Sequence, residues 1–334
     1  MRENLNQIQW LRGIAAVVVI FTHIMGKAYS TGWSGVAFER GGIGVDIFFI
    51  ISGFIMMYVC DGKPQTSVKF IKNRALRILP LHYLILVPLL LVYSVKPGLI
   101  NSTFSGTYII ESVFLIPVKI GSYQYLNPVV WTLCYEMMFY IIFSLFLSFN
   151  DIRKTAFCTV VVILSLVIAG FIYRGDSPLV LGITNSISVE FCMGMMLYLL
   201  YKNEKLKVNP YVMIGAAIVL YFAFDKTSLP RFVICGLPSA VLFVGFINLK
   251  NKFIRPLNVL GDISYEIYIS HILVVTAVYM VLNTIGIHSL AIYIAACVTA
   301  IIFVGLALHY GYTNKINGFV RRRKIATNKL NDNA

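Results

Sequence analysis

Long apolar runs separated by short polar connections dominate the chain. Ten of these runs are each roughly 20 residues long, which is the length that a helix needs to cross the hydrocarbon core of a bilayer. We therefore predict an all-α, polytopic integral membrane bundle of about ten transmembrane helices. The predicted helices cover residues 8–26, 42–60, 77–95, 128–149, 155–173, 182–201, 209–225, 231–249, 261–283 and 289–311.

The first run and two other segments set the expected domain organisation. Arg12 and His23 interrupt the first run and no small-residue cleavage site follows it, so we expect an uncleaved first span. Residues 1–314 are expected to form one membrane domain, and 315–334 a basic cytoplasmic tail. The apolar connection 96–127 is too short to span the bilayer and leave loops on both sides. It is either a packed loop or a lid over an outward-facing cleft.

Composition agrees with a chain that faces lipid. Of the 334 residues, 58% are hydrophobic and 13% charged, and the mean hydropathy is +0.80. A soluble domain carries about 25% charged residues, so these charges are too few to cover a water-facing surface. The six cysteines form no Cys-x-x-Cys pair and are expected to be packing residues. We expect no metal site.

The net charge of +14 reflects membrane orientation and not a nucleic-acid partner, because the basic residues lie in the short connections between apolar runs. With a cytoplasmic N-terminus, 20 of the 28 Lys and Arg residues fall on the inner side and 7 on the outer side. This asymmetry predicts that both termini are cytoplasmic, and hence that the number of spans is even.

Ionisable residues inside predicted spans are costly in lipid, so each is a functional hypothesis. Arg12 and His23 share the first helix, eleven positions apart. This spacing is about three turns, so both side chains lie near one face, about 16 Å apart along the axis. The other ionisable candidates within spans are Asp46, Glu136, Glu190 and His271.

These residues predict two polar regions. Arg12, Arg74 and Arg77 would form a basic region at the inner boundary, suited to phosphate groups. The alternative for the Arg74 and Arg77 pair is an anchor on anionic lipid headgroups. The outer region would combine histidine with carboxylates, as general base catalysis requires. A histidine that only hydrogen-bonds a neighbouring residue is the alternative there.

Four motifs follow one another along the chain: Gln9–Ala16 with His23, Gly42–Phe54, Asn73–Pro80 and Pro128–Tyr140. Together they resemble the acyltransferase family 3 membrane proteins, particularly those that O-acetylate bacterial O-antigens and exopolysaccharides. Gly261–His271 is a weaker match. The resemblance covers most of the chain, and the order of the four motifs makes it specific.

The resemblance implies an acetyl-CoA donor in the cytoplasm, an acceptor hydroxyl on a lipid-linked cell-surface glycan, and a location in the bacterial inner membrane. It implies that Arg12, Arg74 and Arg77 bind the CoA thioester. His23 would be the catalytic base, with Glu136 or Asp46 orienting its imidazole. The expected substrate-binding residues are Trp131, Tyr135, Glu190 and His271.

Three alternatives stay open. His23 would act either as a general base or as a carrier of the acetyl group in a covalent relay. Some relatives have an extracytoplasmic domain that completes the transfer, so we expect this chain to act alone or with a separate partner. A transporter or flippase of a lipid-linked sugar is the rival function, because intramembrane charges would serve it too.

Overall fold

The computed structural model describes residues 5–38, 40–96, 98, 106–119, 125–224, 227–316 and 318. Within this part of the chain the regular structure is entirely helical. Eight helices are long and apolar enough to cross a membrane, and two shorter apolar helices, Pro210–Phe224 and Phe232–Ile247, lie between the sixth and seventh of them. The eight are Asn6–Ser30, Arg40–Cys60, Ser67–Val95, Pro128–Phe149, Ile152–Ile172, Pro178–Lys202, Ser264–Thr284 and Leu290–Ile316. The predicted all-α membrane bundle is confirmed.

The centre of the bundle is α2 (Ile43–Cys60), which packs against α1 (Asn6–Ser30) and α8 (Val189–Lys202). Glycines allow the close approach of α2 and α8. A Cβ atom on Gly53 would lie 2.2 Å from the Phe191 carbonyl oxygen, and one on Gly194 would lie 2.1 Å from that of Ile50. Small residues let helix backbones pack closely in lipid, where the hydrophobic effect does not drive helices together.

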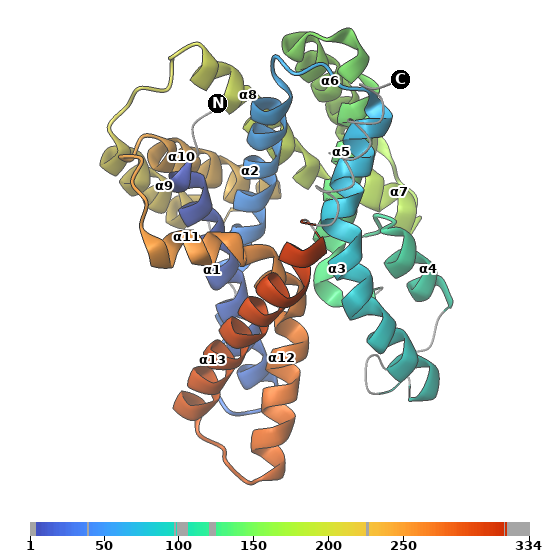
Figure 1. The fold of residues 1–334 in the computed structure, drawn as a ribbon, viewed down its shortest axis with the longest axis vertical. Coiled ribbons are helices and arrows are strands. Elements are labelled where there is room, and N and C mark those ends of the chain that lie inside the picture. The colour runs from blue at the N-terminus through green and yellow to red at the C-terminus, as the bar shows by residue number, and fades with distance from the viewer. Residues whose placement is uncertain are drawn as a thin grey trace.

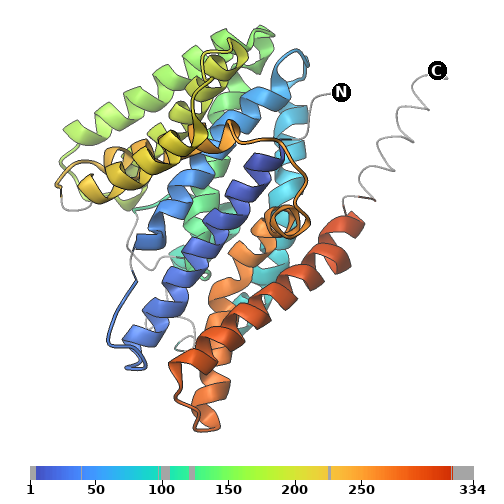
Figure 2. The same ribbon diagram turned by 90° about the vertical axis from the view of Figure 1, so that its left-hand side faces the viewer.

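The remaining helices surround this centre (Figures 1 and 2). α12 (Ser264–Thr284) and α13 (Leu290–Leu308) form a hairpin that reaches the lower end of both views. The other helices that complete the bundle are α5 (Trp131–Leu145), α6 (Ile152–Ile172), α7 (Pro178–Ile183), α9 (Pro210–Phe224) and α10 (Leu237–Ile247).

The third span begins ten residues before its predicted start. α3 covers Ser67–Val95, and the hydroxyl of Thr66 caps it by accepting a hydrogen bond from the Lys69 backbone amide. The apolar pattern did not reveal this start, because the first turns mix polar and apolar residues. Arg74 and Arg77 therefore lie about two to three turns inside α3, and do not open it as the sequence suggested.

Two short helices, α11 (Arg255–Asp262) and α4 (Gly106–Phe114), pack against the long ones. The predicted ninth helix is divided, because α11 ends before α12 begins. The Trp10 indole donates to the Asn258 side chain at 3.0 Å, which fixes α11 to the start of α1.

The second short helix, α4 (Gly106–Phe114), lies within the predicted 96–127 connection and runs beside α3 (Figure 1). The imidazole of His82 and the hydroxyl of Tyr83 donate hydrogen bonds to carbonyl oxygens of α4. The described part of this connection thus packs on the bundle. Residues 97, 99–105 and 120–124 of the connection lie outside the described residues, as do 319–334 of the basic tail.

Candidate active site

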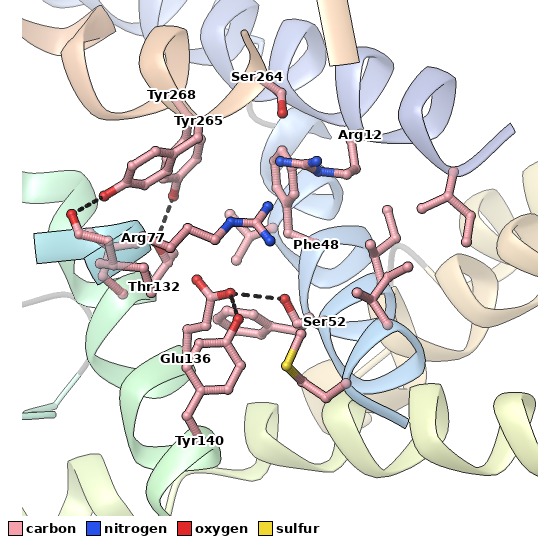
Figure 3. A pocket seen from close by; sticks show the side chains of 18 of the residues that line it. Arg12, Phe48, Ser52, Arg77, Thr132, Glu136, Tyr140, Ser264, Tyr265 and Tyr268 are labelled. Atoms are coloured by element: carbon pink, nitrogen blue, oxygen red, sulfur yellow. Dashed lines mark hydrogen bonds between the residues drawn. The ribbon is translucent and has the colours of Figure 1, made fainter. Parts of the chain in front are cut away.

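One cavity of about 300 Å³ lies between α1, α2, α3, α5 and α12. It extends from Leu5, at the start of α1, to Tyr268 in α12. Its wall is mostly apolar, and a small set of polar side chains reaches into it. These are Gln9, Arg12, Ser52, Arg77, Thr132, Glu136, Tyr140, Ser264 and Tyr265 (Figure 3). An apolar pocket with a few convergent polar groups is the usual form of a small-molecule site.

Among the described residues that line the cavity, Glu136 is the one carboxylate, and two hydroxyl groups hold it. The hydroxyl of Ser52 donates to its Oε1 atom at 3.1 Å, and the hydroxyl of Tyr140 donates to the same oxygen (Figure 3). Tyr140 follows Glu136 by one helical turn, so α5 itself brings the pair together. Ser52 comes from α2, 84 residues earlier.

Two guanidinium groups face this carboxylate across the cavity (Figure 3). Arg12 donates to the side chain of Gln9 at 3.0 Å, and both Arg77 and Glu136 are within electrostatic range of it. Among the described residues neither arginine forms an ion pair, and Arg77 makes no hydrogen bond through its side chain. The cavity therefore contains more positive than negative charge, and its guanidinium donors are available to an anionic ligand.

Aromatic and hydroxyl groups line the cavity where α12 borders it. The Tyr268 and Thr132 hydroxyl groups lie 3.0 Å apart, and the Phe48 ring packs against that of Tyr268 with centroids 5.6 Å apart. The other neighbour of the Tyr268 ring is His271, at 5.8 Å. Tyr268 thus stands between the cavity and the histidine pair described next.

His23 and His271 lie in direct contact. His271 Nε2 is 3.2 Å from His23 Nδ1, and the ring centroids are 4.9 Å apart. His271 is fully buried, whereas His23 is partly exposed. The sequence placed both residues in helices but gave no sign that they meet, because they are 248 positions apart.

In the described part of the chain, neither of the carboxylates expected at His23 contacts it. Glu136 is held in the cavity, and the Asp46 carboxylate binds both the Nε and an Nη atom of Arg231, at 2.9 and 2.8 Å. Glu190 is fully buried beside Asp46 and Arg231. These carboxylates therefore belong to two separate clusters, and neither of them touches His23.

Three further candidates lie away from the cavity wall. Trp131 and Tyr135 pack with the Phe49 ring, with centroid distances of 6.4 Å for both. Arg74 lies over the ring of Phe70, 5.8 Å from its centroid.

Three residues of these clusters were not among the sequence candidates. Ser52 and Tyr140 lie inside motifs that the sequence singled out, so their positions were a usable signal. Arg231 had been counted only as an outer basic residue. Nothing in the sequence indicated that it would meet Asp46, 185 positions earlier.

The fold and the cavity together define a multi-pass helical membrane protein with a polar, net cationic site between its helices. The chain matches the acyltransferase domain model over residues 5–309. It therefore belongs to the acyltransferase family 3 membrane proteins and is an O-acyltransferase. The family resemblance carried by the four motifs is confirmed.

Curated relatives agree with this assignment. The chain is 31% identical to the exopolysaccharide production protein ExoZ of Rhizobium meliloti over 83% of this chain and 89% of ExoZ. It is 25% identical to BcsY of Komagataeibacter xylinus, which is named as a membrane-bound transacylase, over 81% of this chain and 72% of BcsY. It is 24% identical to the O-acetyltransferase OatA of Staphylococcus aureus over 78% of this chain and 49% of OatA. No solved structure matches the chain at a significant level.

Proposed function

We propose that the protein transfers an acetyl group from cytoplasmic acetyl-CoA to a hydroxyl of a cell-surface glycan. The observation that carries the proposal is the cavity between α1 and α3, in which Arg12 and Arg77 have no ion-pair partner among the described residues. CoA has a polyanionic head, and guanidinium groups are well suited to phosphates. Arg12 and Arg77 would bind this head.

The pantetheine arm would extend along α1 toward His23. The eleven-residue spacing corresponds to about 16 Å along the helix, a distance that an extended arm can cover. Tyr268 lies on this path, so its ring would have to move aside for the thioester to reach His23.

The reaction balances with the groups that the proposal names. The acceptor hydroxyl attacks the thioester carbonyl, and its proton passes to His23 as the new C–O bond forms. The C–S bond breaks, and the proton then returns to the departing CoA thiolate. In the covalent alternative, His23 attacks the thioester carbonyl, the C–S bond breaks and CoA leaves as its thiolate. The acceptor hydroxyl then attacks the acyl-histidine, the imidazole departs, and the hydroxyl proton passes to the thiolate.

The acceptor is inferred from the relatives. ExoZ is named for exopolysaccharide production and OatA for O-acetyl transfer, so a glycan hydroxyl is the acceptor that we propose. We further propose a lipid-linked glycan, a location in the bacterial inner membrane, and cytoplasmic termini. Reporter fusions at Ala334 and within 283–289 test this orientation, because they must report opposite sides of the membrane.

The decisive test compares wild-type protein with His23→Gln, each purified in lipid nanodiscs and given labelled acetyl-CoA and polysaccharide. Loss of a positioned general base lowers the rate about 10²- to 10⁴-fold. His288→Ala is the matched control, because His288 packs against Trp33 away from the cavity and should leave transfer unchanged.

Each outcome of this test has a defined meaning. A retained acetyl group on His23, detected by mass spectrometry after rapid quenching, would identify the covalent route. If His23→Gln reconstitutes normally and transfers acetyl at the wild-type rate, the proposed role of His23 is wrong. Movement of a lipid-linked sugar without any acetyl-CoA turnover would instead support the transporter.

A further inference from the structure

His271 is a buried histidine whose protonation is fixed by the backbone. Its Nδ1 atom lies 2.6 Å from the carbonyl oxygen of Tyr268. A carbonyl oxygen only accepts hydrogen bonds, so Nδ1 must carry the proton. Neutral imidazole has one donor and one acceptor nitrogen. The Nε2 atom of His271 therefore has a lone pair, and it is this atom that faces His23.

The same argument applies to His23. Its Nδ1 atom lies 3.0 Å from the Val19 carbonyl oxygen and 3.2 Å from His271 Nε2. Both of these neighbours are acceptors, so His23 Nδ1 carries a proton that the two share. The lone pair of His23 must then be on Nε2. In the part of the chain that the structure describes, no residue hydrogen-bonds this Nε2 atom.

From this chain of donors and acceptors we infer that His271 is a positioning residue, which orients His23 so that its unprotonated Nε2 faces the reacting hydroxyl. The inference rests on the proposed function for the role of His23. In many active sites a carboxylate accepts a hydrogen bond from the Nδ1–H group of the catalytic histidine, which fixes the tautomer and the orientation of its ring. His271 would take the place of that carboxylate.

A neutral acceptor suits this location. Neither Asp46 nor Glu136 touches either histidine, so the resting pair holds no net charge in the interior of the bundle. When His23 takes the proton from the acceptor hydroxyl, its bond to His271 Nε2 becomes charge-assisted. Such bonds are about twice as strong as neutral ones. The stabilisation thus appears only when the proton has moved, which is when it lowers the barrier.

Two other roles for His271 compete with this inference. As a packing residue it would contribute only volume, and as a substrate-binding residue, the role expected from the sequence, it would contact the donor or acceptor directly. Substitutions that differ in side-chain length and in hydrogen-bond acceptors distinguish these three roles of His271. Gln places its amide oxygen near the position of Nε2, so it can still accept from His23. Asn reaches only the position of Nδ1, beside the Tyr268 carbonyl, and Leu fills the volume without any acceptor.

The experiment measures kcat and KM for acetyl transfer by His271→Gln, His271→Asn and His271→Leu in nanodiscs. Acetyl-CoA binding and monodispersity identify the correctly folded variants. Because a hydrogen bond to a charged group is lost, we expect Leu and Asn to reduce kcat about 10- to 100-fold with KM unchanged. Gln should recover most of that loss.

Three results would overturn the inference: wild-type kcat in the Leu variant, Gln no better than Leu, or a change confined to KM. The last would assign His271 to substrate binding.

A readout independent of activity is ¹⁵N NMR of histidine-labelled protein, with the His23→Gln spectrum giving the assignment. We expect a protonated Nδ1 and an unprotonated Nε2 on His23 in the wild type.

The opposite tautomer would refute the inference even if His23 proves to be the catalytic base. Conversely, NMR could find the expected tautomer of His23 while the His23→Gln variant remains fully active. That result would refute the proposed function but would confirm the hydrogen-bond geometry of the two histidines. The two failures are therefore distinguishable.

Discussion

Among the groups of charged residues inside the bundle, the one around Asp46 and the one in the cavity are built differently. Asp46 and Arg231 form a direct pair in which both carboxylate oxygens accept from the guanidinium, and Asp46 is fully buried. In the cavity, Arg12 and Arg77 lie near Glu136, whose bonded oxygen is occupied by the Ser52 and Tyr140 hydroxyls.

The difference separates structural charges from those suited to a ligand. In the first group, Arg231 bonds both carboxylate oxygens of Asp46 and joins the start of α2 to the segment that precedes α10. The cavity group has donors in excess and an open volume beside them. A charge within a membrane bundle that has no matched partner is costly, so such an arrangement is expected where a charged ligand completes it.

The largest effect is expected from breaking the matched pair. Arg231→Ala leaves Asp46 buried without its partner, which costs 3–5 kcal/mol for a fully buried pair. Because the Arg231 side chain is 36% exposed, we expect a loss near the lower end, about 3 kcal/mol. Thermal unfolding of the purified protein in detergent measures it.

The double variant Asp46→Leu with Arg231→Met is the control for this prediction. Replacing both members of a buried pair by apolar residues is often close to neutral. Most of the stability should therefore return. A double variant as unstable as Arg231→Ala would show that the pair does more than satisfy its own charges.

The contrast between these groups also marks what the sequence could predict. The eight long helices follow from the length and hydropathy of each run, because crossing lipid requires about 20 apolar residues whatever their neighbours. The Arg231 contact to Asp46 and the His271 contact to His23 do not follow. Most of these helices are apolar on every face, so the pattern does not tell which face turns toward which helix.

The cavity residues were partly predictable for a different reason. Arg12 and Glu136 stand out as charges within apolar runs, and the four motifs drew attention to the segments that contain Ser52, Arg77 and Tyr140. That these side chains line the same cavity depends on which helices pack against one another, and no local sequence pattern encodes this. Among the described residues, Asp46 bonds Arg231 and Glu136 bonds Ser52 and Tyr140, so neither carboxylate contacts His23. The sequence shows the chemistry of each group but not its depth or rotation.

The next largest effect is expected from Arg77→Ala, which removes a cavity donor without breaking an ion pair. The loss of charge-assisted bonds to the CoA phosphates should weaken acetyl-CoA binding roughly 10- to 100-fold. Thermal stability without ligand should change little, because Arg77 is exposed and its side chain makes no hydrogen bond to the described residues. Isothermal titration of nanodisc-embedded protein with acetyl-CoA measures the binding. An unchanged affinity would remove Arg77 from the site.

The smallest effect is expected from Arg74→Ala, and it tests whether the two arginines of α3 act as one basic patch. They are three residues apart, yet Arg77 lines the cavity and Arg74 lies over the Phe70 ring outside the cavity wall. A charge outside the cavity acts on the phosphates only through a screened, longer-range interaction. We therefore expect Arg74→Ala to weaken acetyl-CoA binding at most about fivefold, and less at high salt.

The alternative for Arg74 is an anchor on anionic lipid, so the titration is repeated in nanodiscs with and without phosphatidylglycerol. An anchor predicts that the stability difference between Arg74→Ala and wild type depends on the anionic lipid while CoA affinity does not. If Arg74→Ala lowers acetyl-CoA affinity as much as Arg77→Ala, the cavity wall does not define the binding site. The phosphates would then be bound by the whole basic face of α3, as the sequence alone suggested.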